Sequence, residues 1–231
     1  MPVVLVPGYM TDADLWTDVL PALERVGRVS HADVTRDDTV EEMARRLVAD
    51  APERFVLIGF SMGGYVAREA ARLAPERVSA LALIATSARG DNHIQAARRA
   101  AVAGQMKPEA FKGLSHGAVA ASLRPGADEA QVERVRAMSR RLGAEVFRRQ
   151  SLLVREDDLE RLGEIACPTL VVAAGQDQLR TLDEARELAD GIAGATLKVI
   201  EGSGHMIPME APDALSAVLS EWFAGLAEIA G

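Results

Sequence analysis

Residues 55–64 of the chain are Phe55-Val56-Leu57-Ile58-Gly59-Phe60-Ser61-Met62-Gly63-Gly64. The first six are almost continuously apolar, as in a strand that is buried on both faces of a parallel sheet. The segment 62–74 that follows has the apolar spacing of an amphipathic helix. This stretch therefore predicts a buried strand that turns sharply into a helix, with Ser61 at the turn.

Similar apolar runs, rich in Val, Leu and Ile, recur along the chain. Together they predict six strands, at 3–6, 29–34, 55–60, 78–85, 169–174 and 196–200. Amphipathic segments between them predict helices at 14–25, 40–50, 62–74, 181–190 and 213–227. Because strands and helices alternate, we expect an α/β fold with a mostly parallel sheet of about six strands flanked by helices.

The alternation is interrupted in the segment 87–166, which contains helix-like stretches at 128–142 and 145–154 and no strand pattern. Since this segment follows a strand, it should leave the sheet at the carboxyl edge, where ligands bind in parallel α/β folds. We expect 1–86 and 167–231 to form the core and 87–166 to form a helical lid inserted in it. A helical domain that takes no part in the chemistry is the alternative.

Composition excludes several classes of partner. The 231-residue chain has a formal net charge of −8 and no basic stripe that could follow a nucleic-acid backbone. No uncharged apolar run reaches the roughly 18 residues of a membrane span, and no basic leader follows Met1. The single cysteine, Cys167, allows no intramolecular disulfide. These features predict a soluble cytoplasmic protein without nucleic-acid or membrane partners.

The turn at Ser61 carries the pattern Gly-x-Ser-x-Gly at 59–63. A strained strand-to-helix turn of this kind pushes the serine hydroxyl out above the sheet. Because that hydroxyl is a poor nucleophile at neutral pH, it needs a base within hydrogen-bond reach. Among the four histidines, only His205 lies in a glycine-rich loop after a predicted strand. We therefore expect Ser61 to be a nucleophile and His205 its base.

A histidine base needs an acid that holds it in the right tautomer. Asp177 lies just beyond the strand predicted at 169–174, in the sequence Gly175-Gln176-Asp177. It is the candidate acid, which gives the chain order Ser61, Asp177, His205. Asp91, which follows the preceding strand, is the alternative acid.

Five motifs now carry a resemblance to a known family: Val6-Pro7-Gly8-Tyr9, the Gly59 to Gly64 turn, Cys167-Pro168-Thr169-Leu170, Gly175-Gln176-Asp177 and Gly202-Ser203-Gly204-His205. Over nearly its whole length the chain resembles the α/β-hydrolase family, in which nucleophile, acid and histidine follow this order. The resemblance implies an oxyanion hole made by the backbone N–H groups of Met62 and Tyr9, with Met10 as the alternative to Tyr9.

Two features depart from the family pattern. Many relatives have His-Gly where this chain has Pro7-Gly8, although the expected donor in that loop is backbone. The usual core has eight strands, and the antiparallel pair that precedes the oxyanion strand has no room before Val3. We expect a shortened sheet of six strands with one uncovered edge. The chain is then either a monomer or a homodimer paired at that edge.

Three residues near the expected site are candidate substrate contacts. Met10 and Met206 flank the proposed catalytic groups and would offer an apolar wall for an acyl or alkyl chain. Arg89 lies just past a strand end and could pair with a substrate carboxylate, or with Asp91. Ordinary packing is the alternative for the two methionines.

The resemblance implies hydrolysis of a small carboxylic ester, thioester or lactone through an acyl-enzyme on Ser61, with no cofactor and no metal. The same triad also serves lyases that abstract a proton and C–C bond hydrolases, such as the menaquinone-pathway synthase that the chain also resembles. A ligand-binding receptor module that keeps the triad is an alternative of another class.

Overall fold

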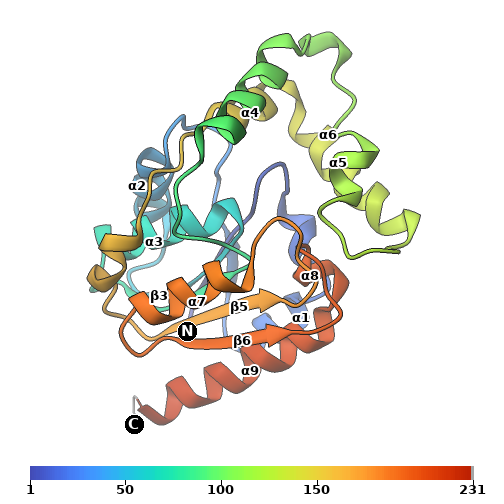
Figure 1. Cartoon of the computed structure of the whole chain (residues 1–231). Coiled ribbons are helices and arrows are strands. Elements are labelled where there is room, and N and C mark those ends of the chain that lie inside the picture. The colour runs from blue at the N-terminus through green and yellow to red at the C-terminus, as the bar shows by residue number, and fades with distance from the viewer. Residues whose placement is uncertain (230–231) are drawn as a thin grey trace.

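The computed structural model describes residues 1–229 and shows one sheet flanked by helices (Figure 1). The six strands are β1 (Val3–Val6), β2 (Val29–His31), β3 (Phe55–Phe60), β4 (Val78–Ile84), β5 (Thr169–Ala174) and β6 (Thr196–Ile200). They are arranged in the order β2-β1-β3-β4-β5-β6, and every neighbouring pair is parallel. This confirms the predicted six-stranded parallel sheet.

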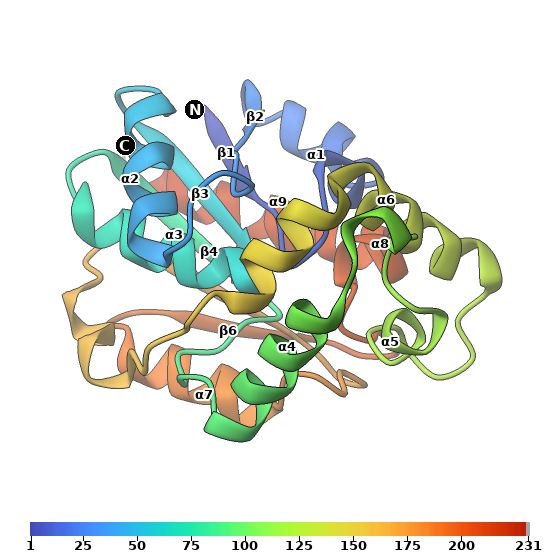
Figure 2. The same cartoon turned by 90° about the horizontal axis from the view of Figure 1, so that it is seen from above.

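Helices cover both faces of this sheet (Figure 2). The helices of the core are α1 (Leu20–Glu24), α2 (Val40–Asp50), α3 (Met62–Leu73), α7 (Leu182–Gly191), α8 (Ile207–Glu210) and α9 (Pro212–Ile229), and a 3-10 turn, η1, spans Ala13–Trp16. No helix within residues 1–229 has the length and apolar character needed to cross a membrane.

Neighbouring residues of each strand belong to opposite apolar layers, because side chains alternate along a strand. Val3 and Leu5 of β1 pack with buried residues of α1 and α9 on one face. Val4 and Val6 pack with α2, α3 and α7 on the other. With both faces covered, the central strands are apolar along their whole length, which is why the sequence pattern at 55–60 was informative.

Two predicted elements are shorter than expected. The strand predicted at 29–34 ends at His31, because its only partner, β1, stops before Pro7, which has no N–H for the ladder. The helix predicted at 14–25 is divided into η1 and α1. Pro21 cannot donate an intrahelical hydrogen bond, so it is accommodated in the first turn of α1.

The segment 87–166, here called the insert, connects β4 to β5. It contains α4 (His93–Gln105), η2 (Pro108–Ala110), α5 (His116–Ala120), α6 (Glu129–Leu152) and η3 (Leu159–Glu164). Its helices α4, α5 and α6 lie together above the core in Figure 1. The stretches predicted at 128–142 and 145–154 form the two halves of α6, which are separated by a non-helical backbone at Gly143, with φ 79°.

Arginines of α6 attach the insert to acidic loops of the core. Arg134 pairs with Asp14 at 3.2 Å and with Asp18 at 2.5 Å. Arg141 pairs with Asp12 at 2.9 Å and with Asp14 at 3.0 Å. These contacts place the first half of α6 over η1 and the residues on either side of it.

Candidate active site

The turn from β3 to α3 holds Ser61 in a conformation that residues other than glycine rarely adopt, with φ 51° and ψ −115°. Two hydrogen bonds keep it there. The Ser61 N–H donates to the carbonyl of Ile84 at 2.9 Å, and Thr86 Oγ1 donates to the carbonyl of Ser61 at 2.7 Å. Backbone strain maintained by its surroundings in this way is typical of functional turns.

The glycines beside Ser61 are required by close backbone contacts. A Cβ atom on Gly59 would lie 2.6 Å from the carbonyl oxygen of Gly63. A Cβ atom on Gly63 would overlap the carbonyl oxygen of Val6, and one on Gly64 would overlap the side chain of Thr86. The Gly-x-Ser-x-Gly pattern is therefore needed for the turn itself.

The structure brings Ser61, His205 and Asp177 together in one hydrogen-bonded chain. His205 Nε2 lies 2.9 Å from Ser61 Oγ, and His205 Nδ1 lies 2.7 Å from Asp177 Oδ2. The side chains of His205 and Asp177 are almost inaccessible to solvent, at 6% and 2% exposed. Ser61, His205 and Asp177 thus have the geometry of a catalytic triad.

Backbone donors fix the carboxylate of Asp177. Its Oδ1 atom accepts hydrogen bonds from the N–H groups of Leu179 at 2.7 Å and Arg180 at 3.0 Å. The loop that carries Asp177 is in turn joined to the His205 loop, because the Gln176 N–H donates to the carbonyl of Ser203 at 2.9 Å. Oδ2 is therefore left to face the imidazole.

The loop that carries His205 packs tightly against neighbouring groups. The ring of Phe60 contacts the imidazole, with ring centroids 5.2 Å apart. The carboxylate of Glu210 accepts hydrogen bonds from the N–H groups of Met206 at 3.1 Å and Arg124 at 2.6 Å. Burial raises the pKa of the Glu210 carboxyl. Since Arg124 belongs to the insert, this carboxyl joins the His205 loop to the insert.

Two backbone N–H groups near Ser61 have no hydrogen-bond acceptor among the described residues. The loop after β1 runs directly beside the serine, because a Cβ atom on Gly8 would lie 3.3 Å from Ser61 Cβ. Within residues 1–229, the N–H groups of Tyr9 and Met62 donate to no protein acceptor. The Met10 N–H, by contrast, donates to Gln150 Oε1 at 2.8 Å. The geometry thus favours Tyr9 over Met10 as the second donor.

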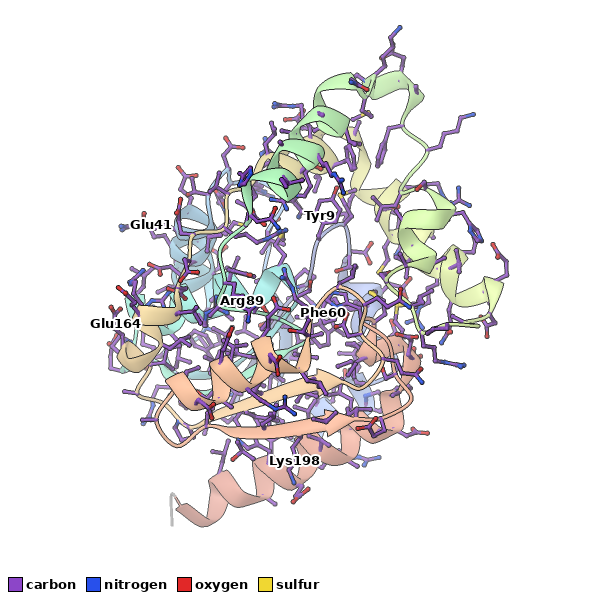
Figure 3. All side chains as sticks on the ribbon, viewed as in Figure 1. Tyr9, Glu41, Phe60, Arg89, Glu164 and Lys198 are labelled. Carbon is purple, nitrogen blue, oxygen red and sulfur yellow. The ribbon has the colours of Figure 1, made fainter. Side chains whose placement is uncertain are left out.

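A cavity of about 600 Å³ lies between Tyr9 and the insert. Its apolar wall includes Tyr9, Val102, Met106, Phe111, Leu114 and Phe147. Figure 3 shows Tyr9 on the side of the core that faces the insert, and Phe60 deeper in the core. Burial raises the pKa of the Tyr9 phenol, which therefore stays neutral. The cavity is large enough for a small acyl or alkyl group.

The comparisons with known proteins agree with this geometry. The sequence matches the family model described as "Alpha/beta hydrolase family" over residues 3–218. The chain belongs to the alpha/beta hydrolase family. Among solved structures, a thermophilic esterase from Thermogutta terrifontis is similar to this alpha/beta hydrolase with a TM-score of 0.87 and 27% identity, covering 98% of this chain and 90% of that one.

Two further relatives match with lower identity or over a shorter stretch of the chain. The enol-lactonase from Burkholderia xenovorans LB400, with a TM-score of 0.86, covers 96% of this alpha/beta hydrolase and 91% of its own chain, and at 22% identity it shows the fold alone. A pimeloyl-[acyl-carrier protein] methyl ester esterase of Photobacterium profundum is 37% identical over 94 residues. That match spans 37% of this chain and 37% of the relative.

None of the three candidate substrate contacts lines the cavity of this alpha/beta hydrolase. Met10 is fully buried and packs with Ala103 and Phe147. Met206 is 3% exposed and belongs to the apolar core. The Arg89 guanidinium, labelled in Figure 3, donates to both carboxylate oxygens of Glu187, at 2.8 and 2.6 Å. Each side chain already has a structural partner.

The alternative acid, Asp91, lies in a different environment from Asp177. Its carboxylate pairs with Arg99 Nη1 at 3.0 Å and with Arg155 Nη1 at 3.1 Å. Although burial opposes ionisation, these two guanidinium groups hold the pKa of Asp91 below its ordinary value. Asp91 thus fixes the start of the insert. Within residues 1–229, no three His, Cys, Asp or Glu side chains gather as a metal site requires.

Sequence reasoning missed two residues of α6 that contact the loop after β1. Gln150 bonds the Met10 N–H, and Ser151 Oγ lies 2.7 Å from the Tyr9 hydroxyl. Helical spacing could have identified Gln150 as a buried residue. It lies three residues beyond Phe147 and four beyond Val146, which places it on the apolar face of the predicted helix. A glutamine on such a face becomes buried and needs specific partners.

Proposed function

We propose that this alpha/beta hydrolase cleaves a small carboxylic ester, with Ser61 as nucleophile, His205 as base and Asp177 as the acid that orients the base. The observation that carries the proposal is the hydrogen-bonded chain from Ser61 Oγ to His205 Nε2 at 2.9 Å and from His205 Nδ1 to Asp177 Oδ2 at 2.7 Å. The esterase names of the relatives support the same reaction class.

The geometry supports a two-step reaction. Ser61 Oγ attacks the ester carbonyl while His205 Nε2 takes the hydroxyl proton, and the Tyr9 and Met62 N–H groups bind the resulting oxyanion. The C–O bond to the alcohol then breaks, and His205 returns the proton to the leaving oxygen. Water, deprotonated by His205, attacks the acyl-enzyme, and collapse of the second tetrahedral intermediate releases the carboxylic acid and regenerates Ser61.

The cavity beside Tyr9 is the proposed place for the acyl chain. Its apolar wall comes mainly from the insert, which would act as the lid of the site. The pimeloyl-[acyl-carrier protein] methyl ester esterase match makes methyl esters of medium-length acids suitable first substrates. A thioester or a lactone could occupy the same site, since each places a carbonyl carbon at Ser61 and a leaving group beside His205.

The proposal is tested by hydrolysis of p-nitrophenyl esters from acetate to octanoate, followed by methyl esters of the best chain length. Ser61→Ala and His205→Ala should abolish turnover. Ser220→Ala, on an exposed position of α9, is the matched control and should leave it unchanged. Labelling of Ser61 by a fluorophosphonate, read by peptide mass spectrometry, checks the nucleophile separately.

Turnover that persists in Ser61→Ala would contradict the assignment of the nucleophile. A folded wild-type protein that reacts with the fluorophosphonate at Ser61 but hydrolyses no ester would favour the alternative, a proton-abstracting lyase or a C–C bond hydrolase on the same triad.

A further inference from the structure

The loop that follows β1 has a backbone that does not hold its shape by itself. Met10 has φ 54°, a left-handed conformation that is costly for any residue with a Cβ atom. On one side of the loop, Thr11 Oγ1 accepts from the Gly8 N–H at 2.9 Å and donates to the Gly8 carbonyl at 3.1 Å. The other side, at Met10, needs a separate restraint.

Gln150 supplies that restraint from the insert. Its side chain is fully buried, and its two polar ends are both used. Oε1 accepts from the Met10 N–H at 2.8 Å, and Nε2 donates to the carbonyl of Val34 at 3.1 Å. Because the Val34 carbonyl requires the donor end, the amide cannot flip, and the oxygen is fixed toward Met10.

The bond from Met10 to Gln150 determines which N–H group of the loop can bind an oxyanion. With Met10 N–H directed at Gln150, the neighbouring Tyr9 N–H is the free donor of the loop beside Ser61. An oxyanion donor is effective only when it is oriented before the reaction begins. A loop whose strained residue lost its partner would sample other backbone conformations, and the Tyr9 N–H would no longer be held in place.

We propose that Gln150 is a positioning residue for the oxyanion hole, which makes the insert part of the machinery that stabilises the transition state. This inference rests on the proposed ester hydrolysis. Gln150 touches neither the substrate nor the reacting atoms. It acts through the backbone of Met10 and Tyr9, so its loss should affect the transition state more than the bound substrate.

The test compares Gln150→Met with the wild type on the best p-nitrophenyl ester. Methionine has nearly the same length but offers Met10 and Val34 no hydrogen bond. We expect kcat to fall about 10- to 100-fold, as for partial loss of an oxyanion donor, while KM changes less than about threefold. The affinity for an alkyl trifluoromethyl ketone, whose adduct with Ser61 carries an oxyanion, should fall by the same factor as kcat.

Ser139→Ala is the matched control. Ser139 is also fully buried on α6, where its hydroxyl accepts from the Leu114 N–H at 2.9 Å and donates to the Arg136 carbonyl at 2.8 Å, away from the oxyanion loop. It should lower the melting temperature without changing kcat or ketone affinity. Gln150→Glu keeps an oxygen for the Met10 N–H, and its carboxyl, which burial keeps protonated, offers a hydroxyl to the Val34 carbonyl, so this variant should retain most of both. If Gln150→Met does not fold, Gln150→Asn, whose shorter side chain cannot reach both partners, takes its place with the same expectation.

Several outcomes would overturn the inference. One is a folded Gln150→Met enzyme whose kcat and ketone affinity match those of Ser139→Ala. Another is Gln150→Glu losing as much as Gln150→Met, which would mean that the hydrogen bond to Met10 does not set the rate. If the wild type is active, either result rejects only the proposed role of Gln150 and leaves the proposed ester hydrolysis standing. A wild type that neither hydrolyses esters nor binds the ketone rejects the proposed function as well.

Discussion

At the scale of single residues, the two carboxylate oxygens of Asp177 have different hydrogen-bond partners. Oδ1 is held by the N–H groups of Leu179 and Arg180, and Oδ2 faces His205. Because the backbone donors require an acceptor, they also decide how a substituted amide at this position would be oriented. The orientation of that amide would then select the tautomer of the histidine.

Asp177→Asn should therefore reduce kcat by about 10⁴-fold. The amide oxygen would stay on the two backbone N–H groups, so the NH₂ group would donate to His205 Nδ1. The ring proton would move to Nε2, which could then accept no proton from Ser61. Steady-state kinetics with the best p-nitrophenyl ester measures the loss.

Asp91→Asn is the control for this prediction, since Asp91 pairs with Arg99 and Arg155. It should lower the melting temperature and leave kcat close to that of the wild type. Full activity in Asp177→Asn together with loss in Asp91→Asn would reverse the assignment of the acid.

Sequence alone predicted the parts of the site that depend on local backbone geometry. The Gly59 to Gly64 pattern specified the turn because a Cβ atom on each glycine would collide with atoms a few residues away or on a neighbouring strand. The position of His205, 144 residues from Ser61, followed only from placing both at the carboxyl edge of one sheet. Gln150 was missed because its partners, Met10 and Val34, belong to loops whose meeting with α6 no local pattern specifies.

At the scale of elements, α4 supplies part of the wall of the cavity. Val102 on this helix is 58% exposed and yet lines the cavity wall. A branched aliphatic side chain there leaves room for an acyl chain that approaches from Tyr9. A larger side chain at the same position would occupy that room without removing any contact from the core.

Val102→Trp should shift the preferred ester toward shorter acyl chains, with octanoate losing at least about tenfold in kcat/KM relative to acetate. Displacing an acyl chain by two or more methylenes from an apolar wall costs roughly this much. The p-nitrophenyl ester series gives the measurement. Ala101→Trp, at an exposed position of the same helix outside the cavity, should leave the profile unchanged. An unaltered profile in Val102→Trp would place the acyl chain elsewhere.

At the scale of the whole molecule, the insert shares an apolar layer with the core and adds partly exposed ion pairs to it. The sheet and its helices share two extended apolar layers. The first half of α6 is attached to the core through Arg134 and Arg141, whose side chains are 26% and 51% exposed. The fold of the core was predictable because apolar periodicity specifies it. The docking of α6 buries Val132, Val135 and Met138 against that core and adds ion pairs between segments more than 110 residues apart, which no local pattern specifies.

High ionic strength should therefore weaken the attachment of the insert more than the stability of the sheet core. At about 1 M NaCl the Debye length is near 3 Å, so partly exposed ion pairs lose most of their attraction, while apolar burial is not weakened. We expect limited proteolysis of the insert to become faster with salt, and the melting temperature of the sheet core to stay nearly constant. Arg134→Gln with Arg141→Gln at low salt should reproduce the effect. Cleavage that is independent of salt in the wild type would mean that the apolar contacts of α6 are sufficient to hold it without the ion pairs.

The ion pairs of α6 also mean that substitutions could change the salt tolerance of the protein without changing its catalytic residues. The acids that receive its arginines, Asp12, Asp14 and Asp18, lie outside the triad and outside the sheet. Replacing those charge pairs by apolar ones would adapt the enzyme to brine without a change to any reacting group.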